Sequence, residues 1–197
     1  MRGLDEPSGT VLTLANTDWL HHRLTITGPD ETVLAFRKAA AGSGGIPWHL
    51  DLDQLQEDWF HLLMSSPGRE NPDQQTISVA GARVLSGQLR DAVGRRHELA
   101  IARVGRSQVC PFDLHVLVPV IQPVLRLGPD DPRALAWLWQ HWGTTQALRH
   151  VEDHSRPASD TLVFTFWSAD WTPWRALATL AEAWPTLRFH ARPTYAQ

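Results

Sequence analysis

Apolar and polar residues alternate with a period of two in three stretches of the chain, a pattern typical of strands with one buried face. The first stretch covers residues 23–27, where Leu24 and Ile26 are the apolar members. The other two stretches lie near the end of the chain, and their apolar members are Leu162, Phe164 and Phe166, then Leu187, Phe189 and Ala191. A shorter strand is expected over residues 146–154.

Helical spacing predicts amphipathic helices between these strands. Asp30 is expected to cap the first helix, which ends at the glycine-rich sequence AGSGG. A second helix is predicted from Pro132 to Trp142, capped by an aspartate before it and stopped by Gly143 in the left-handed conformation. A last helix is predicted to carry Pro173 in its first turn.

The middle of the chain gives weaker signals. Residues 84–93 have helical spacing, and we expect Gly94 to interrupt that helix near its end. Residues 112–118 alternate, but the neighbouring prolines favour an edge strand or an irregular segment.

Apart from the middle segment, the elements follow the order strand, helix, strand, strand, helix, strand. This order predicts an α+β fold with a ferredoxin-like split βαβ core, in which an antiparallel sheet carries two helices on one face. We therefore expect a single domain over residues 1–197. Its core would take residues 20–42 and 129–195, and a large, partly helical insertion would take residues 43–128.

Composition narrows the possible partners and compartments. The formal net charge of −3 predicts no general attraction of the whole molecule to phosphate backbones or anionic membranes. Cys110 is the only cysteine, so no disulfide can form within the chain. The first residues lack the apolar region of a signal peptide, and no run of eighteen apolar residues occurs, so we expect a cytoplasmic protein with no membrane partner.

Two segments resemble the YubB ferredoxin-like domain proteins of plasmids and phages. NTDWLHHRLTITGP resembles the opening turn and first strand of that family, with Leu20 where the family usually has cysteine. HWGTTQA, followed by FTFWSADWTPWRALATL, resembles two later family segments, with His141 in place of the usual asparagine. The likeness covers about residues 16–40 and 112–195. It implies the ferredoxin-like fold and a mobile-element setting, and it implies no established activity.

The face of the sheet away from the helices is the strongest candidate binding surface. RNA-recognition modules stack single-stranded bases on aromatic side chains of such a face, with cationic side chains beside them. We expect this face to carry Arg23, Trp167, Arg188, His190 and Arg192. The aromatic signature of those modules is missing, and the insertion could instead cover this face.

Histidines suggest two further kinds of site. His150, Glu152 and His154 alternate, so a regular strand would place all three on one face, where they are weak candidates for metal ligands. His21 or His22 could act as the base of a metal-independent ribonuclease. In both cases solvated surface residues are the commoner explanation, and no cofactor is expected.

The sequence WLWQHWGTT concentrates three of the ten tryptophans beside a glycine. Trp137, Trp139 and Trp142 do not share one helical face, so we interpret this segment as a packing corner. The favoured hypothesis is therefore a non-enzymatic mobile-element accessory protein that recognises a protein partner. Single-stranded nucleic-acid binding is the alternative, and ribonuclease activity is the third hypothesis.

Overall fold

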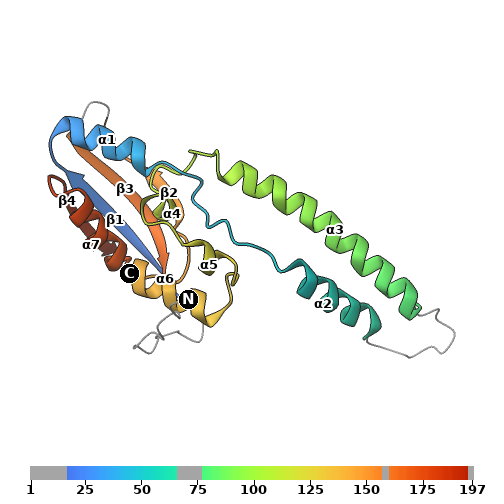
Figure 1. Ribbon diagram of the computed structural model, residues 1–197. Coiled ribbons are helices and arrows are strands. Elements are labelled where there is room, and N and C mark those ends of the chain that lie inside the picture. Colours follow the sequence, from blue (N-terminus) through green and yellow to red (C-terminus); the bar gives the residue numbers. More distant parts are fainter. Residues whose placement is uncertain (1–16, 66–76, 157–159, 195–197) are drawn as a thin grey trace. The chain divides into compact units, whose positions relative to one another are not determined.

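The computed structural model of the protein describes residues 17–65, 77–156 and 160–194 (Figure 1). These residues form two compact units. The sheet unit takes the described residues up to Trp48 and from Val104 onward, and the helical unit takes the described part of His49–Arg103. Residues 104–128 thus belong with the sheet, whereas the sequence placed them in the added segment with residues 43–103.

The sheet unit contains a four-stranded antiparallel sheet and helices, as expected for an α+β protein. The strand order is β2-β3-β1-β4, and every neighbouring pair is antiparallel. The strands are β1 (Trp19–Thr27), β2 (Arg149–Asp153), β3 (Thr161–Ala169) and β4 (Arg188–Thr194). Leu24 pairs with Phe164 in β3 and with Ala191 in β4, which aligns the three apolar faces predicted from the alternation.

Two helices pack on one face of this sheet and form the hydrophobic core with it. Helix α1 (Asp30–Ala40) contacts β3, and α7 (Trp174–Ala183) contacts β4. Phe36 from α1 is fully buried and meets Phe112, which stacks on Phe164 and Phe166 with ring centroids 5.4 and 5.8 Å apart. Burial of several large aromatic side chains in one cluster supplies a major part of the hydrophobic stabilisation.

Helix α6 (Pro132–Trp142) has the ends that the sequence predicts. The Asp131 carboxylate accepts a hydrogen bond from the Arg133 amide at 2.8 Å, and Gly143 ends the helix with φ 77°. The prediction for the first helix is wrong in one respect. Asp30 is the first residue of α1, and the preceding Pro29 occupies the cap position without a side-chain hydrogen bond.

The alternation at residues 112–118 does not produce a strand. This segment forms the short helix α4 (Leu114–Leu117), and α5 (Gln122–Leu125) follows it. Three prolines in residues 111–123 remove backbone donors that a strand would need. Leu114, Val124 and Leu125 enter the core instead.

The helical unit is an antiparallel hairpin of α2 (Leu52–Met64) and α3 (Val79–Val104). Glu57 pairs with Arg83, and Leu52 lies against Gly94. Gly94 does not interrupt α3: a Cβ added there would lie 3.1 Å from Leu52 Cδ1, so the glycine lets the two helices approach closely. Among the described residues, no helix has the length and apolar character that a membrane span requires.

Candidate nucleic-acid interface

The sheet has one face that the helices of its own unit do not cover. We call it the open face and define it by the odd-numbered residues of β1 and of β3 up to Trp167, and by the even-numbered residues of β4. These residues are exposed or half-buried, whereas their neighbours from His22 to Ile26 in β1 and from Leu162 to Ser168 in β3 are buried. The period of two thus separates a core face from a solvated face.

All five residues predicted for nucleic-acid binding lie on the open face. Arg23 in β1 is directly opposite Arg192 in β4, and Arg188 and His190 follow along the same strand. Trp167 lies in β3 opposite His21, with ring centroids 5.1 Å apart. The Arg192 guanidinium donates a hydrogen bond to His190 Nε2 at 3.1 Å.

The structure adds Trp19 and Arg149 to this surface, and the sequence reasoning missed both. Arg149 in β2 pairs with Trp167, and its guanidinium lies 3.9 Å from the centroid of the Trp19 ring. A cation over an indole ring is a favourable interaction. Trp19 continues the alternation of β1 toward the start of the strand, which is the signal that could have identified it.

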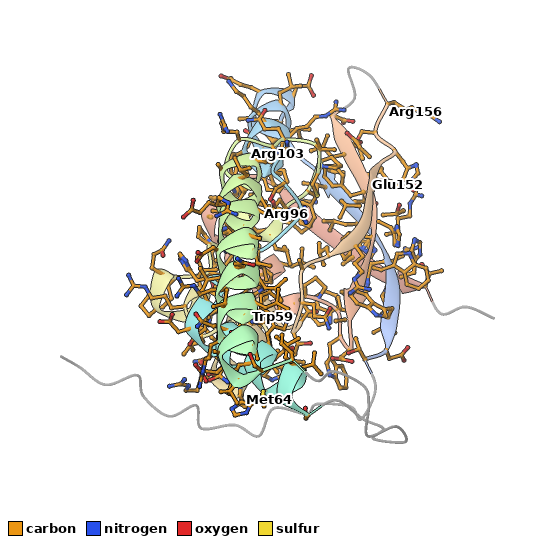
Figure 2. The ribbon with its side chains drawn as sticks, turned by 90° about the vertical axis from the view of Figure 1, so that its right-hand side faces the viewer. Trp59, Met64, Arg96, Arg103, Glu152 and Arg156 are labelled. Atoms are coloured by element: carbon orange, nitrogen blue, oxygen red, sulfur yellow. The ribbon has the colours of Figure 1, made fainter. Side chains whose placement is uncertain are left out.

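The open face is rich in positive charge, although the chain as a whole is acidic. It carries Arg23, Arg149, Arg188 and Arg192. Within the described residues, none of these four arginines forms an ion pair with a carboxylate. Glu152 in β2 lies opposite Thr165 and brings one carboxylate to the same face at its β2 edge (Figure 2), where it is 3.3 Å from His154 Nε2. Unpaired guanidinium groups beside indole rings can contact phosphates while bases stack.

Strand β2 does not keep the strict alternation on which the metal prediction depends. Arg149 pairs with Trp167 and Glu152 pairs with Thr165, so β2 advances by three residues while β3 advances by two. His150, within this bulge, has a φ of 48°. His154 is hydrogen-bonded to Thr165 at 2.9 Å. Across the described ranges, no three His, Cys, Asp or Glu side chains are grouped so that they could hold a metal ion.

The two candidate catalytic histidines have different environments. His21 is half-buried on the open face, and its Nδ1 lies 3.3 Å from Thr194 Oγ1. His22 is fully buried on the core side, where burial lowers its pKa. Of these two histidines, only His21 is placed for a proton-transfer role toward a ligand on the open face.

A group of buried hydrogen bonds around Asp170, which we call the polar joint, connects the segments on which the family resemblance is based. Asp170, with φ 62°, accepts hydrogen bonds from the Asp18 amide at 3.0 Å and from the Thr145 hydroxyl at 3.2 Å. The Thr144 hydroxyl donates to the Ala169 carbonyl at 2.8 Å. The three segments thus fix one another at the end of the sheet where Trp19 and Arg149 meet.

A pocket of about 560 Å³ lies beside this joint. Its polar lining includes Asp130, Gln146 and Arg149, and its apolar lining includes Ile46 and Trp48. This volume is in the range of pockets that hold small organic ligands. Arg149 belongs both to the pocket wall and to the open face.

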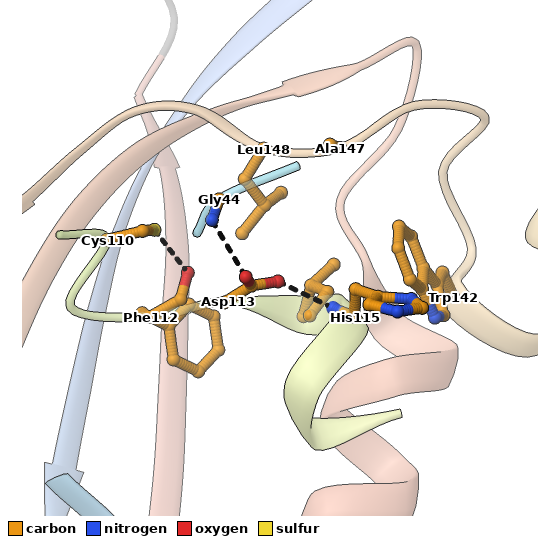
Figure 3. Close-up of a pocket in the computed structure, with 9 residues that line it drawn as sticks. Gly44, Cys110, Phe112, Asp113, His115, Trp142, Ala147 and Leu148 are labelled. Carbon is orange, nitrogen blue, oxygen red and sulfur yellow. Dashed lines mark hydrogen bonds between the residues drawn. The ribbon is translucent and has the colours of Figure 1, made fainter. Parts of the chain in front are cut away.

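A second cavity, near Cys110, has a structural role. It measures only about 10 Å³ and is enclosed partly by Asp113, whose carboxylate accepts hydrogen bonds from the Gly44 and His115 amides at 2.7 and 2.8 Å (Figure 3). The Cys110 thiol donates to the Phe112 carbonyl at 3.3 Å, and burial raises its pKa. A high pKa keeps the thiol protonated and weakly nucleophilic, as expected for a structural cysteine.

The tryptophan-rich segment forms a packing corner, as predicted. Trp142 is fully buried and donates from Nε1 to the Val118 carbonyl at 2.8 Å. Trp137 stacks on His141 with ring centroids 4.1 Å apart, and Trp139 meets Trp171 edge-on. The three rings therefore pack against different neighbours.

Comparison with known proteins gives a fold relationship. No protein-family model matches the chain, and no curated protein matches it. Among solved structures, the chain is similar to the crystal structure of protein api92 from Yersinia pseudotuberculosis, described with the family model DUF1281. The TM-score is 0.51 at 12% sequence identity, and the match covers 90% of each chain. At this identity the likeness concerns the fold alone.

Proposed function

We propose that this protein binds single-stranded nucleic acid on the open face of a ferredoxin-like core. The connectivity β1-α1-β2-β3-α7-β4 and the strand order β2-β3-β1-β4 support this description of the core. In this proposal the helical hairpin is part of an insertion between α1 and β2. The resemblance to the YubB family, and with it a mobile-element setting, stays a prediction.

The observation that carries the proposal is the group of four arginines on the open face, none of them paired with a carboxylate in the described residues. Leaving four guanidinium groups together on one face is electrostatically unfavourable unless an anion neutralises them. Trp19 and Trp167 supply aromatic rings among these charges, and rings of this kind stack on bases regardless of sequence. The pocket beside Arg149 could receive a base at one end of the bound strand.

Fluorescence anisotropy with labelled oligo-dT and oligo-U, measured over a range of salt concentrations, tests the proposal. Each phosphate contact contributes about 0.7 to the slope of log K against log salt for a single strand. We therefore expect Arg23→Gln/Arg192→Gln to reduce that slope by about 1.4. The matched control is Arg126→Gln/Arg175→Gln, which removes the same charge from exposed positions outside the open face. Absence of binding at low salt, or equal losses in the two variants, would contradict the proposal.

Trp167→Ala separates stacking from charge. Loss of one stacked base is expected to weaken binding by about 1–3 kcal/mol while leaving the salt slope unchanged. Trp174→Ala is the control, because this tryptophan is exposed at the start of α7, away from the open face. A Trp167→Ala variant that binds like the wild type would show that bases do not stack on this ring.

A protein partner is the second candidate, supported by two exposed tryptophans. Trp171 and Trp174 are 42% and 55% exposed, although large aromatic side chains are usually covered. They flank Thr172 and Pro173, which are buried, so the backbone that presents them is fixed. Co-purification with the wild type but not with Trp171→Ala/Trp174→Ala would favour this role, and identical co-purified proteins would argue against it.

A further inference from the structure

The pocket of about 560 Å³ beside the polar joint, which we call the end pocket, has polar groups that base stacking on the open face does not use. All of its lining residues belong to the sheet unit. They come from Thr17 before β1, the loop at residues 44–48, residues 129–135 at the start of α6, residues 145–149 before and in β2, and Asp170 after β3. Five separate segments thus surround a space in the size range that small organic ligands occupy.

Asp170 brings a buried negative charge to the end pocket. The residue is 9% exposed, and its carboxylate accepts hydrogen bonds from the Asp18 amide and the Thr145 hydroxyl. Both donors are neutral, and no cationic side chain among the described residues forms an ion pair with this carboxylate. A buried carboxylate is unfavourable unless hydrogen bonds or a cation compensate its charge. Because an ionised carboxylate offers about four acceptor sites, Asp170 can accept further hydrogen bonds from a ligand.

Asp130 and Trp48 add a second carboxylate and an aromatic wall to the end pocket. Asp130 is exposed, and its side chain forms no hydrogen bond or ion pair with another residue that the structure describes. Trp48 is half-buried against the hydrophobic core, and in the described part of the chain no second aromatic ring stacks on it. Its ring is therefore available to stack on a flat ligand.

The Arg149 guanidinium contacts one residue of the open face and one residue of the end pocket. It lies 3.9 Å from the centroid of the Trp19 ring, and it donates a hydrogen bond to the Gln146 side-chain oxygen at 3.3 Å. A phosphate bound by this guanidinium would therefore lie between the stacking surface and the pocket. The nucleoside attached to that phosphate can then enter the pocket.

The two carboxylates decide which kind of nucleoside fits. Carboxylates only accept hydrogen bonds, so they favour a base that presents donors. Adenine, cytosine and guanine each carry an exocyclic amino group, whereas uracil and thymine present carbonyl oxygens. The same carboxylates repel a terminal phosphate, because like charges at short range destabilise each other.

We propose that the end pocket takes the last nucleoside of the bound strand, at an end without a terminal phosphate, and selects a base with an exocyclic amino group. Trp48 stacks on the base, and Asp130 accepts a hydrogen bond from the amino group. Asp170, which lies at the same end of the sheet as Arg149, accepts from the terminal sugar hydroxyl. This inference rests on the proposed binding of single-stranded nucleic acid to the open face.

Competition fluorescence anisotropy with deoxyuridine oligonucleotides tests the proposal. Each competitor carries a single deoxycytidine at the 5′ end, at the 3′ end or in the middle, because cytosine replaces a carbonyl of uracil by an amino group at nearly the same size. We expect deoxycytidine at one of the two ends to tighten binding about tenfold, as one hydrogen bond to a charged group provides, and the middle position to have little effect. A phosphate added to that end should cancel the gain.

The outcomes separate this inference from the binding on which it rests. Equal affinities for all the oligonucleotides would overturn the selection of the last base and leave binding on the open face in place. Absence of binding by every oligonucleotide at low salt would overturn both.

Asp130→Asn tests the contact with the base. An asparagine amide can donate as well as accept, so the variant should lose the tenfold preference for a terminal deoxycytidine and still bind the uniform deoxyuridine strand. Asp130 is exposed and has no side-chain partner among the described residues, so we expect the fold to persist. Glu31→Gln is the matched control, because it removes the same charge from an exposed position of α1, and it should keep the preference. A preference retained in Asp130→Asn, or lost equally in both variants, would overturn the proposed contact.

Discussion

Acidification should destabilise the sheet unit through His22, whose ring is fully enclosed. Its Nδ1 lies 2.9 Å from the Leu20 carbonyl oxygen, and its Nε2 lies 2.7 Å from Thr172 Oγ1. Since a carbonyl only accepts, this geometry assigns the proton to Nδ1 and makes Nε2 the acceptor of the Thr172 hydroxyl. Burial is the largest cause that lowers the pKa of His22 from its usual 6.5, and the Leu20 carbonyl partly opposes it.

Proton linkage gives the sign and the magnitude of the effect. In the unfolded chain His22 titrates near 6.5, so below that pH the unfolded state binds a proton that the folded state excludes. The stability is therefore complete above pH 6.5 and is lost as the pH falls toward the lower pKa of the folded state. Within that window one proton changes the free energy of unfolding by about 1.4 kcal/mol per pH unit.

His115 adds to this effect. Burial lowers its pKa as well, partly opposed by Asp113, and its Nδ1 accepts a hydrogen bond from the Val120 amide at 3.2 Å. The two histidines together give a slope of up to about 2.7 kcal/mol per pH unit. Folded domains have a total stability of about 5–15 kcal/mol, so each pH unit between 6.5 and the lowered pKa values would remove a measurable part of it.

Urea denaturation at a series of pH values measures this slope. His22→Gln should remove about 1.4 kcal/mol per pH unit from the slope below pH 6.5, because glutamine binds no proton. Thr172→Val is the control: it deletes the hydroxyl but keeps the imidazole, so stability should fall at every pH with the slope retained. If His22→Gln unfolds with the wild-type slope, the ring does not exclude a proton and the reasoning is refuted.

Three further substitutions test the packing around the sheet. Asp113→Ala should lower the free energy of unfolding in urea by about 2–4 kcal/mol, since it leaves two part-buried amides without their acceptor. A loss below about 1 kcal/mol, which is typical of an exposed helix cap, would contradict this role. Gly143→Ala should lower the free energy of unfolding by about 2 kcal/mol in the same assay, because φ is 77° and the new Cβ would lie 3.2 Å from the Trp174 amide nitrogen. A variant as stable as the wild type would show that α7 can move away from the new methyl group. Trp142→Phe should reduce the free energy of unfolding by about 1–3 kcal/mol, because the hydrogen bond to the Val118 carbonyl is lost, and should therefore lower the midpoint of thermal unfolding. An unchanged midpoint would argue against that bond.

Local rules in the sequence predict the strands of the sheet and the ends of α6 well. The alternation around Leu24 and Phe164 could be read from the sequence, because each strand has one buried face and keeps a regular period. The ends of α6 depend on the cap at Asp131 and on Gly143, whose conformational preferences are local. The same alternation located Arg23 and Arg192 on the open face.

Features that depend on distant partners were beyond these rules. The bulge at His150 depends on the register between β2 and β3, which single-strand periodicity does not encode. One hydrogen bond to Asp113 comes from the Gly44 amide, 69 residues earlier in the sequence. Arg149 joins the candidate site only because β2 lies beside β3 and places its guanidinium over Trp19.

Irregularities protect both outer edges of the sheet against pairing with other molecules. Strand addition requires a regular ladder of free amides and carbonyls along an outer strand. The bulge interrupts that ladder in β2, and Pro193 removes an amide from β4. Growth into continuous intermolecular sheets is thereby disfavoured at both edges.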